Sequence, residues 1–490
     1  MPLLSDLDYS NPVKLPINLE TIAIIGGGAS GAIILDTLLK EPSNIKRIVV
    51  YERQDKLGGI WLYNKDTIST PNDIIKSGNL NFDNDPQLDN PFKSSYSNYL
   101  ILPKNTQERF IETPSYFDIK TNIVERLMTY SDVNKWNVSG SSEDGKYVPG
   151  NIVQEYIEKY IVRNINESRF ELKLGTAVED VERYDKDQGG YGFKLTIRTP
   201  YNKDQDYWYQ DRFDYVIVAT GHYHVPYIPY VPGLRELQEL KPNIVQHAKF
   251  FRTSTPYRNK TVVVVGSRAS GADLTKFVAK EENTRVYQSI RNSVNMKKSN
   301  FENVEKKPVI REITTDDDEV KVVFEDGSIV YNPDYIIYCT GYLFSYPFLN
   351  RLFNNSLTYQ GQTVANLYQH TFLINEPLIS IIGVPIDAIS FRAFEYQAIL
   401  IARFITGKIA LPSRRIQSEW VNDRYKLKKN SRAYHTIGVD DALEYMTTLT
   451  ELGQVSSKTP IGRQFPEITP EMVQLHRESG EILRKFWDEY

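Results

Sequence analysis

Glycine spacing marks the first segment whose residue types could bind a ligand. Gly26, Gly28 and Gly31 form a GxGxxG pattern between the apolar run IAII and the helix-like run AIILDTLL. Glycine permits a tight turn and lets a phosphate reach the backbone, while the free N–H groups of a helix start attract negative charge. The candidate phosphate-binding residues are therefore Gly26, Gly27, Gly28, Ala29, Ser30 and Gly31.

An acidic residue follows at the distance that a dinucleotide requires. Glu52 closes the next apolar run, RIVVY, about 20 residues after the glycines, where a carboxylate can bind ribose hydroxyls. A strand–helix turn without a ligand is the alternative, because glycine-rich turns are common. The strand, the glycines, the helix and the acid together favour a bound dinucleotide.

A second unit of the same kind lies in TVVVVGSRASGADLT. Gly266 and Gly271 repeat the outer glycines, and Arg268 occupies the middle position. Arg268 would crowd a pyrophosphate unless its side chain points away or itself holds phosphate. An ordinary strand–helix turn is again the alternative. We expect backbone N–H groups at this helix start to hold phosphate, and the candidates are Gly266, Ser267, Ser270, Gly271, Ala272 and Asp273.

Arginine replaces the acid in the second unit. Arg291 ends the next apolar run, TRVYQSIR, where an arginine can accommodate a 2′-phosphate and favours NADPH over NADH. Lys297 and Lys298 follow closely, and a surface arginine without a ligand is the alternative. Two dinucleotide sites in one chain suggest hydride transfer to a flavin, so we predict FAD at the first site and NADPH at the second.

Short apolar runs punctuated by glycine must position these residues. They are IAIIGGG, RIVVYE, YVIVATGHY, VVVVGSRASG and YIIYCTGY, and each predicts a buried parallel strand. Residues 151–165 and 271–282 carry helical patterns between them. The alternation predicts an α/β fold with two Rossmann-like dinucleotide-binding domains, the NADPH domain being inserted into a split FAD domain. We place the FAD domain at residues 1–225 and 342–490 and the NADPH domain at 226–341.

Composition excludes several other classes of protein. The 490 residues carry 58 Lys and Arg against 62 Asp and Glu, and this net charge of −4 gives no sign of nucleic-acid binding. One cysteine, Cys339, excludes an internal disulfide, a cysteine metal site and the cysteine pair of a disulfide reductase. We expect Cys339 to be buried and inert. We also expect no metal site and no transmembrane segment, since no apolar run approaches roughly 18 residues.

Two stretches lack the periodicity of the other segments. Residues 64–120 are rich in Asn, Asp, Ser and Pro, which predicts a long surface excursion, and residues 137–147 predict a loop. The pairs Thr220–Gly221 and Thr340–Gly341 end apolar runs, where glycine gives freedom to a crossing between domains or lets the backbone approach FAD.

Longer segments stand in an informative order. They are ERQDKLGGIW, VIVATGHYHVPYIPYVPGL, IIYCTGYLFSYPFL, NLYQHTFLINEPLISIIGV and the later LPS. In this order they resemble the flavin-containing monooxygenases, particularly the yeast and fungal type. The first resembles the segment behind the FAD ribose, the next two the linkers to and from the NADPH domain, and the last two C-terminal FAD-domain segments. The cofactor-contacting set then also includes Gly59, Ile60, Trp61, Val178, Thr220, Gly221, Thr340 and Gly341.

The family fingerprint FxGxxxHxxx(Y/F) is present only in its second half. His247 and Phe251 match it, whereas Lys241 and Asn243 stand at the Phe and Gly positions. We expect His247 to be a structural histidine that bonds a domain linker. A role in proton transfer is the alternative.

One side chain is predicted to act in catalysis. The segment YLILPKNTQERF resembles the family segment that carries an asparagine beside the flavin, and Asn105 is the match. An amide can donate to peroxide oxygens or to the nicotinamide without titrating. Pro103 and Lys104 precede it, and Gln107 stands where the family often has proline. An exposed loop asparagine is the alternative.

The resemblance implies a monooxygenase cycle. NADPH reduces FAD, dioxygen adds to the flavin as a hydroperoxide, and the outer oxygen passes to the sulfur or nitrogen of a small thiol or amine. It also implies a cytoplasmic protein, peripheral association with the endoplasmic reticulum and a homodimer. Two other functions stay open: a Baeyer–Villiger monooxygenase acting on ketones, and a non-enzymatic flavin-binding redox sensor or scaffold.

Overall fold

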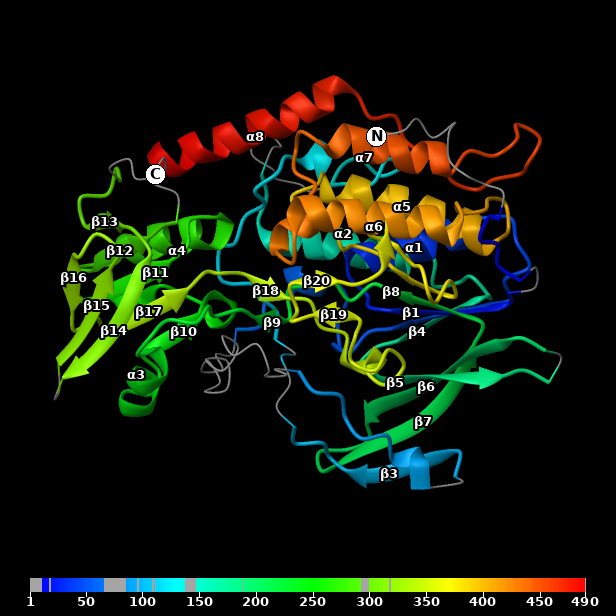
Figure 1. Ribbon diagram of the computed structural model, residues 1–490, viewed down its shortest axis with the longest axis horizontal. Helices are drawn as coiled ribbons and strands as arrows, with labels where there is room; N and C mark the ends of the chain where they lie inside the picture. Colours follow the sequence, from blue (N-terminus) through cyan, green and yellow to red (C-terminus); the bar gives the residue numbers. More distant parts are fainter. Residues whose placement is uncertain are drawn as a thin grey trace.

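The computed structural model describes residues 11–16, 19–65, 85–94, 97–107, 110, 112–136, 147–187, 189–291, 299–316 and 319–489. Most of the predicted loop at 137–147, much of the predicted excursion at 64–120, and both Lys297 and Lys298 lie outside these residues. Figure 1 shows the described residues between 234 and 338, in green to yellow-green, gathered at the left of the view, and the blue N-terminal elements beside the orange C-terminal helices at its right; the red last helix runs back to the left, where the chain ends.

A seven-stranded sheet carries the first glycine turn. Its order is β21-β22-β23-β8-β1-β2-β4, and β1 pairs in parallel with β2 and β8. Ile22, Ala23 and Ile24 of β1 are fully buried, as expected for a strand covered on both faces. The strands are β1 (Thr21–Ile25), β2 (Arg47–Tyr51), β4 (Phe170–Lys173), β8 (Tyr215–Val218), β21 (Leu367–Tyr368), β22 (Phe372–Leu373) and β23 (Ile379–Ile381).

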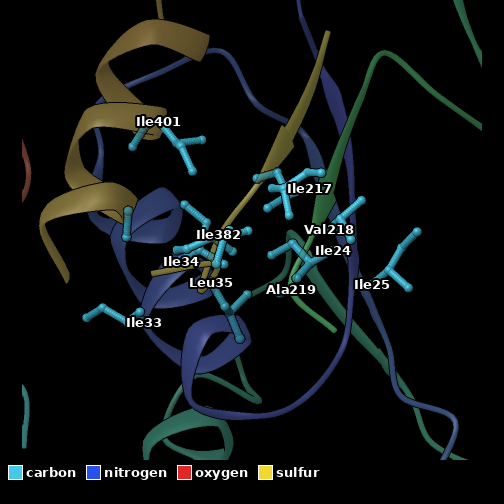
Figure 2. Close-up of a cluster of buried hydrophobic side chains, with 14 of the residues drawn as sticks. Ile24, Ile25, Ile33, Ile34, Leu35, Ile217, Val218, Ala219, Ile382 and Ile401 are labelled. Atoms are coloured by element: carbon cyan, nitrogen blue, oxygen red, sulfur yellow. The ribbon is translucent and has the colours of Figure 1, made fainter. Parts of the chain in front are cut away.

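Helices cover this sheet and hold its core. Helix α1 (Ala29–Lys40) packs against α5 (Ser390–Ile405) and α2 (Gly150–Val162), although they lie far apart in the sequence. Figure 2 shows Ile34 and Leu35 of α1 in one cluster with Ile401 of α5 and Ile217 of β8. The apolar runs of β1 and α1 thus form one continuous core that fixes the turn between them.

A five-stranded parallel sheet carries the second glycine turn. Its order is β10-β17-β11-β12-β13, and α4 (Ala269–Ala279) follows β11 directly. A three-stranded antiparallel sheet, β14-β15-β16, packs beside it with α3 (Leu234–Leu240). The strands are β10 (Val245–His247), β11 (Thr261–Val265), β12 (Arg285–Ser289), β13 (Val304–Lys307), β14 (Ile310–Asp316), β15 (Glu319–Phe324), β16 (Ile329–Tyr331) and β17 (Tyr335–Tyr338).

Two short strands connect these parts of the chain. β9 (Val225–Pro226) leaves the first sheet and pairs with β18 (Tyr342–Leu343), which returns to it. The predicted α/β fold, with one dinucleotide-binding unit inserted into a split one, is therefore confirmed. The boundaries after residues 225 and 341 stay a prediction, which the β9–β18 pair supports.

A four-stranded antiparallel sheet escaped the sequence analysis. Its order is β3-β7-β6-β5, and its first strand lies inside the stretch predicted as an irregular excursion, so that prediction is wrong there. The cause is burial on one face only: along β3, exposed and half-buried residues alternate. A continuous apolar run indicates a strand that is buried on both faces, so the strands of this sheet lack that signal. The strands are β3 (Tyr99–Pro103), β5 (Ala177–Asp185), β6 (Tyr191–Pro200) and β7 (Gln205–Phe213).

The C-terminal part completes the layer over the first sheet. α6 (Arg414–Lys428), α7 (Ala442–Leu452) and α8 (Pro470–Glu489) follow α5, and a small pair, β19 (Thr358–Tyr359) and β20 (Thr363–Val364), precedes it (Figure 1). Within the described residues, no helix combines the length and apolarity needed to cross a bilayer.

Candidate cofactor-binding site

The first glycine turn has a geometry that only glycine allows. Gly26 has φ 117°, and a Cβ built on it would lie 2.4 Å from the carbonyl oxygen of Ala219, at the end of β8. A Cβ on Gly31 would lie 2.0 Å from the carbonyl oxygen of Gly26. The start of α1 is thereby pressed onto the strand ends, with its first N–H groups at the turn.

Glu52, the predicted ribose-binding acid, lies at this turn. Its Oε2 accepts a hydrogen bond from the Gly27 N–H at 2.6 Å, and its Oε1 accepts one from Gln54 at 2.8 Å. Burial raises the pKa of Glu52, although these bonds oppose the shift. Its backbone carbonyl accepts from Thr176, two residues before the buried Val178, so that candidate lies in a segment joined to the same turn.

The GGxW segment closes over the first turn. Gly59 has φ 56°, and a Cβ on Gly28 would lie 3.5 Å from the Gly59 Cα, so the two backbones face each other. Ile60 and Trp61 complete a short 3-10 helix and are half-buried. Ser30 is the second residue of α1, after Ala29, and its hydroxyl donates a hydrogen bond to the Ala219 carbonyl at 3.2 Å.

The second glycine turn repeats this geometry. Gly266 has φ 128°, and a Cβ on it would lie 2.7 Å from the carbonyl oxygen of Cys339, at the end of β17. A Cβ on Gly271 would lie 2.4 Å from the Gly266 carbonyl oxygen. Ser267 lies within the turn, Ser270 and Ala272 lie in the first turn of α4, and the Ala272 N–H donates to the Arg268 carbonyl at 2.9 Å.

Two side chains at this turn bind protein partners. Tyr116 donates a hydrogen bond to Asp273, and burial raises the pKa of Asp273 to about 6. Arg268, the residue at the middle-glycine position, donates to Asp387 at 2.8 Å and is 72% exposed. The Arg268 side chain therefore leaves the turn open. Arg291 is exposed one residue beyond Ile290, past the end of β12.

Hydrogen bonds to backbone carbonyls hold together the linkers between the two units. Thr340 donates a hydrogen bond to the Tyr227 carbonyl, and the Gly341 carbonyl accepts from the Tyr227 N–H at 2.9 Å. Gly341 has φ 88°, and Gly221 has φ 67° with open space where a Cβ would lie. The Thr220 hydroxyl is buried and lacks a partner among the described residues.

His247 bonds a domain linker, as predicted for a structural histidine. Its Nε2 lies 3.0 Å from the Gly341 carbonyl oxygen, and its Nδ1 accepts the Lys249 N–H at 3.1 Å. Burial lowers the pKa of His247 to about 3, so the ring is neutral and donates through Nε2. Both ring nitrogens are engaged, which leaves neither for proton transfer in this conformation.

Asn105 lies directly after β3, in the antiparallel sheet. Its N–H donates to Asp206 at 2.8 Å, and its Oδ1 accepts from the Gln107 N–H at 3.0 Å. Within the described part of the chain, no hydrogen bond joins Asn105 to either glycine turn, and its Nδ2 has no partner. The structure thus does not bring the predicted catalytic amide together with the cofactor-binding candidates.

The sequence analysis missed a group of buried basic residues near the linkers. Lys249 is fully buried, its ammonium donates to the Glu112 carbonyl, and burial lowers its pKa to about 7. Arg53 lies 2.9 Å from the His224 ring, and Arg252 is 2% exposed. The available signal was the half-matching fingerprint, since Lys249 and Arg252 stand within or next to its HxxxF end.

Three family models match the chain. A flavin-binding monooxygenase-like model matches residues 301–465, a FAD-NAD(P)-binding model matches 23–223, and a pyridine nucleotide-disulphide oxidoreductase model matches 145–375. The last describes a reductase class whose cysteine pair this chain lacks, since Cys339 is its single cysteine. Burial raises the pKa of the Cys339 thiol, which agrees with an inert side chain.

Curated relatives match most of the chain. It is 27% identical to the flavin-containing monooxygenase FMO GS-OX5 of Arabidopsis thaliana, over 98% of this chain and 94% of the relative. It is 25% identical to the flavin-containing monooxygenase ustF2 of Aspergillus flavus, over 85% and 88%. Among solved structures, S-allyl-L-cysteine S-oxygenase from Allium sativum superposes with a TM-score of 0.72 at 23% identity, covering 96% of this chain and 94% of that one.

These matches agree with the paired glycine turns and define the class of protein. The chain is similar to the flavin-containing monooxygenases over most of its length, at 25–27% identity to the curated relatives. It is an NADPH-dependent oxidoreductase that uses FAD and NADPH as cofactors.

Proposed function

We propose that the protein oxygenates soft nucleophiles, namely the sulfur or nitrogen of small thiols and amines. One observation carries the flavin chemistry of this proposal: two glycine turns of the same geometry lie at the ends of parallel strands in two sheets that short paired linkers connect. Such a frame brings a nicotinamide cofactor and a flavin into one molecule. When bound, FAD supplies the oxygen-transferring chemistry, which we propose to pass through a flavin hydroperoxide.

The chain's own residues would bind and shield the cofactors. We propose that Glu52 and the first turn hold the FAD ribose and pyrophosphate, and that the second turn holds the pyrophosphate of NADPH. Water exclusion near the reacting atoms would come from the aromatic side chains at the linkers, such as the half-buried Tyr223 and Tyr342. The proposed cofactor-contacting residues are those assigned from the sequence; Asp273 would contribute its backbone, because its side chain is bound by Tyr116.

The substrate class rests on the names of relatives. The garlic protein is named for S-oxygenation of S-allyl-L-cysteine, and at 23% identity it shows only that the fold is shared. Cyclohexanone monooxygenase also shares the fold, with a TM-score of 0.55 at 13% identity. A panel of thiols, amines and ketones, scored by NADPH consumption and oxygenated product together, separates the two chemistries. Ketone oxygenation without thiol or amine turnover would replace our proposal. We also propose a cytoplasmic homodimer.

Arg291→Ala should weaken the binding of NADPH much more than the binding of NADH. We expect the apparent NADPH constant to rise about tenfold or more, because a hydrogen bond to a charged phosphate contributes roughly 1.5–3 kcal/mol. The NADH constant should change little, since NADH lacks the 2′-phosphate. Arg285→Ala, at the opposite end of β12, is the matched control. Equal changes for both cofactors would remove Arg291 from the 2′-phosphate site.

Asn105→Ala should keep flavin reduction and uncouple it from oxygen transfer. We expect hydrogen peroxide to replace most of the oxygenated product, because an amide donor would be lost next to the reacting oxygens. Asn105→Asp keeps the acceptor for Gln107, loses the amide donor and adds a negative charge, so it should uncouple as well. Asn202→Ala removes a similar acceptor in an exposed turn and serves as the control. Tight coupling in both Asn105 variants would place the amide outside the active site.

A further inference from the structure

Arg432 is an arginine without a counter-ion at the junction of the two linkers. It begins a short 3-10 helix (Arg432–Tyr434) between α6 and α7. Its guanidinium lies on the backbone of Gly341: a Cβ built there would be 2.0 Å from Nη1. Among the described residues, Arg432 forms no side-chain hydrogen bond or ion pair, and its Nε is buried. Burying part of a guanidinium without an acceptor is costly, so the position calls for an anion.

The backbone that Arg432 contacts leads directly to the second glycine turn. Gly341 lies two residues after Cys339, whose carbonyl oxygen packs against Gly266. Tyr223 and Tyr342 meet edge to face at 5.4 Å beside it, and Tyr223 is within electrostatic range of Arg432, Asp387 and Arg268. Arg268 follows Gly266 by two residues. The second turn is thus bordered by one guanidinium of its own and one from the split domain.

The charged groups around Arg432 can accommodate an anion that binds and dissociates. Asp387 is the carboxylate of this cluster, and it already binds Arg268 at 2.8 Å. That pair is exposed, with side chains 72% and 50% accessible, so it is weak and can be exchanged. His222 is buried near Arg432, and burial together with the Arg432 charge lowers the pKa of His222 to about 3, so its ring is neutral.

We propose that Arg432 binds the pyrophosphate of NADPH held on the second glycine turn, and that Arg268 leaves Asp387 to bind the same group. This proposal rests on the proposed NADPH site and adds a ligand-binding residue from outside the inserted unit. NADPH would then be held from both sides of the linkers. Because the two arginines and Asp387 belong to different units, binding would also fix their relative position.

Binding measurements on the FAD-loaded protein test this without turnover. Arg432→Gln should raise the dissociation constant of NADP⁺ about tenfold, as expected for a lost charged hydrogen bond. It should leave unchanged the dissociation constant of adenosine 2′-monophosphate, which lacks the pyrophosphate. Arg432→Lys should recover part of the NADP⁺ affinity. Asp387→Asn should tighten NADP⁺ binding, since it releases Arg268. Arg235→Gln, on the exposed face of α3, is the matched control.

The outcomes separate this inference from the assignment of the site. An Arg432→Gln variant with unchanged NADP⁺ affinity, or with equal loss for adenosine 2′-monophosphate, overturns the role of Arg432. Failure of the unmodified protein to bind either probe would instead overturn the NADPH site itself. Retention of the yellow flavin colour in the variant shows that it is folded, so a misfolded variant is not mistaken for a weak binder.

Discussion

Replacing Gly26 with alanine is expected to give a colourless protein that consumes no NADPH. An added Cβ would lie 2.4 Å from the Ala219 carbonyl oxygen, inside any tolerable contact, and would require φ 117° of an alanine. The strand end or the turn must then move, and the pyrophosphate loses the backbone surface that holds it. The measurement is the flavin absorbance of the purified protein, followed by NADPH consumption.

Gly407→Ala is the matched control for this effect. Gly407 also has a positive φ, 66°, but a Cβ there meets nothing within 4 Å. Alanine at this position carries the backbone strain of roughly 1–2 kcal/mol without the collision. We expect it to keep its flavin. If Gly26→Ala retains bound FAD as well as Gly407→Ala does, the first turn is not the FAD pyrophosphate site.

Replacing Arg463 with methionine should lower the free energy of unfolding by about 3–5 kcal/mol, the range for breaking a buried ion pair. Arg463 is 7% exposed. Its Nη1 donates to Glu395 at 2.6 Å, and its Nη2 donates to Asp36 at 2.5 Å and to Asp132 at 3.0 Å. Asp36 of α1 and Glu395 of α5 are fully buried, so the substitution removes a cationic partner from two buried carboxylates and leaves Asp36 with Lys40 and Arg163 and Glu395 with Arg392. Chemical denaturation measures the loss.

The same network predicts how stability changes with pH. Burial by itself would raise the pKa of Asp36. The hydrogen bond from Lys40 and the charges of Arg463 and Arg163 outweigh burial and lower this pKa. Arg463 likewise lowers the pKa of Asp132 against the effect of burial. Carboxyls with depressed pKa values stabilise the fold above their unfolded pKa of about 4, and this stabilisation is lost as the pH falls.

In Arg463→Met, the acid-dependent part of the stability should therefore shrink. The variant should be far less stable than the unmodified protein at pH 7 and closer to it near pH 3. Arg415→Met removes an exposed arginine paired with Glu419 and should leave the unfolding curve unchanged. A constant difference across this pH range would mean that packing, rather than the ion pairs, accounts for the role of Arg463.

The parts of the fold that the sequence revealed are those where one physical requirement fixes the residue types. Strands buried on both faces must be apolar, and turns pressed onto a neighbouring strand must be glycine, so the sequence predicts β1, β11 and both turns. The antiparallel sheet requires neither strands that are apolar on both faces nor glycine at its turns, so the sequence did not predict it. Helices were placed within a few residues, because their ends depend on local caps.

Contacts between distant residues were beyond the sequence. Arg268 pairs with Asp387, 119 positions away, and no local pattern announces that partner. Arg432 looks like any charged residue between two helices until Gly341 is found beneath it. Asn105 shows the opposite case: a family segment assigned its role, whereas its hydrogen bonds lie within the antiparallel sheet and its turn.

Anaerobic mixing of the FAD-loaded protein with NADPH tests the central claim most directly, because it follows electrons from the second turn to the first. The flavin colour should bleach without oxygen, with one NADPH consumed for each FAD, and should return when air and a thiol are admitted, together with S-oxygenated product. A flavin colour that persists under excess NADPH, or a protein that takes up no flavin, would contradict the account.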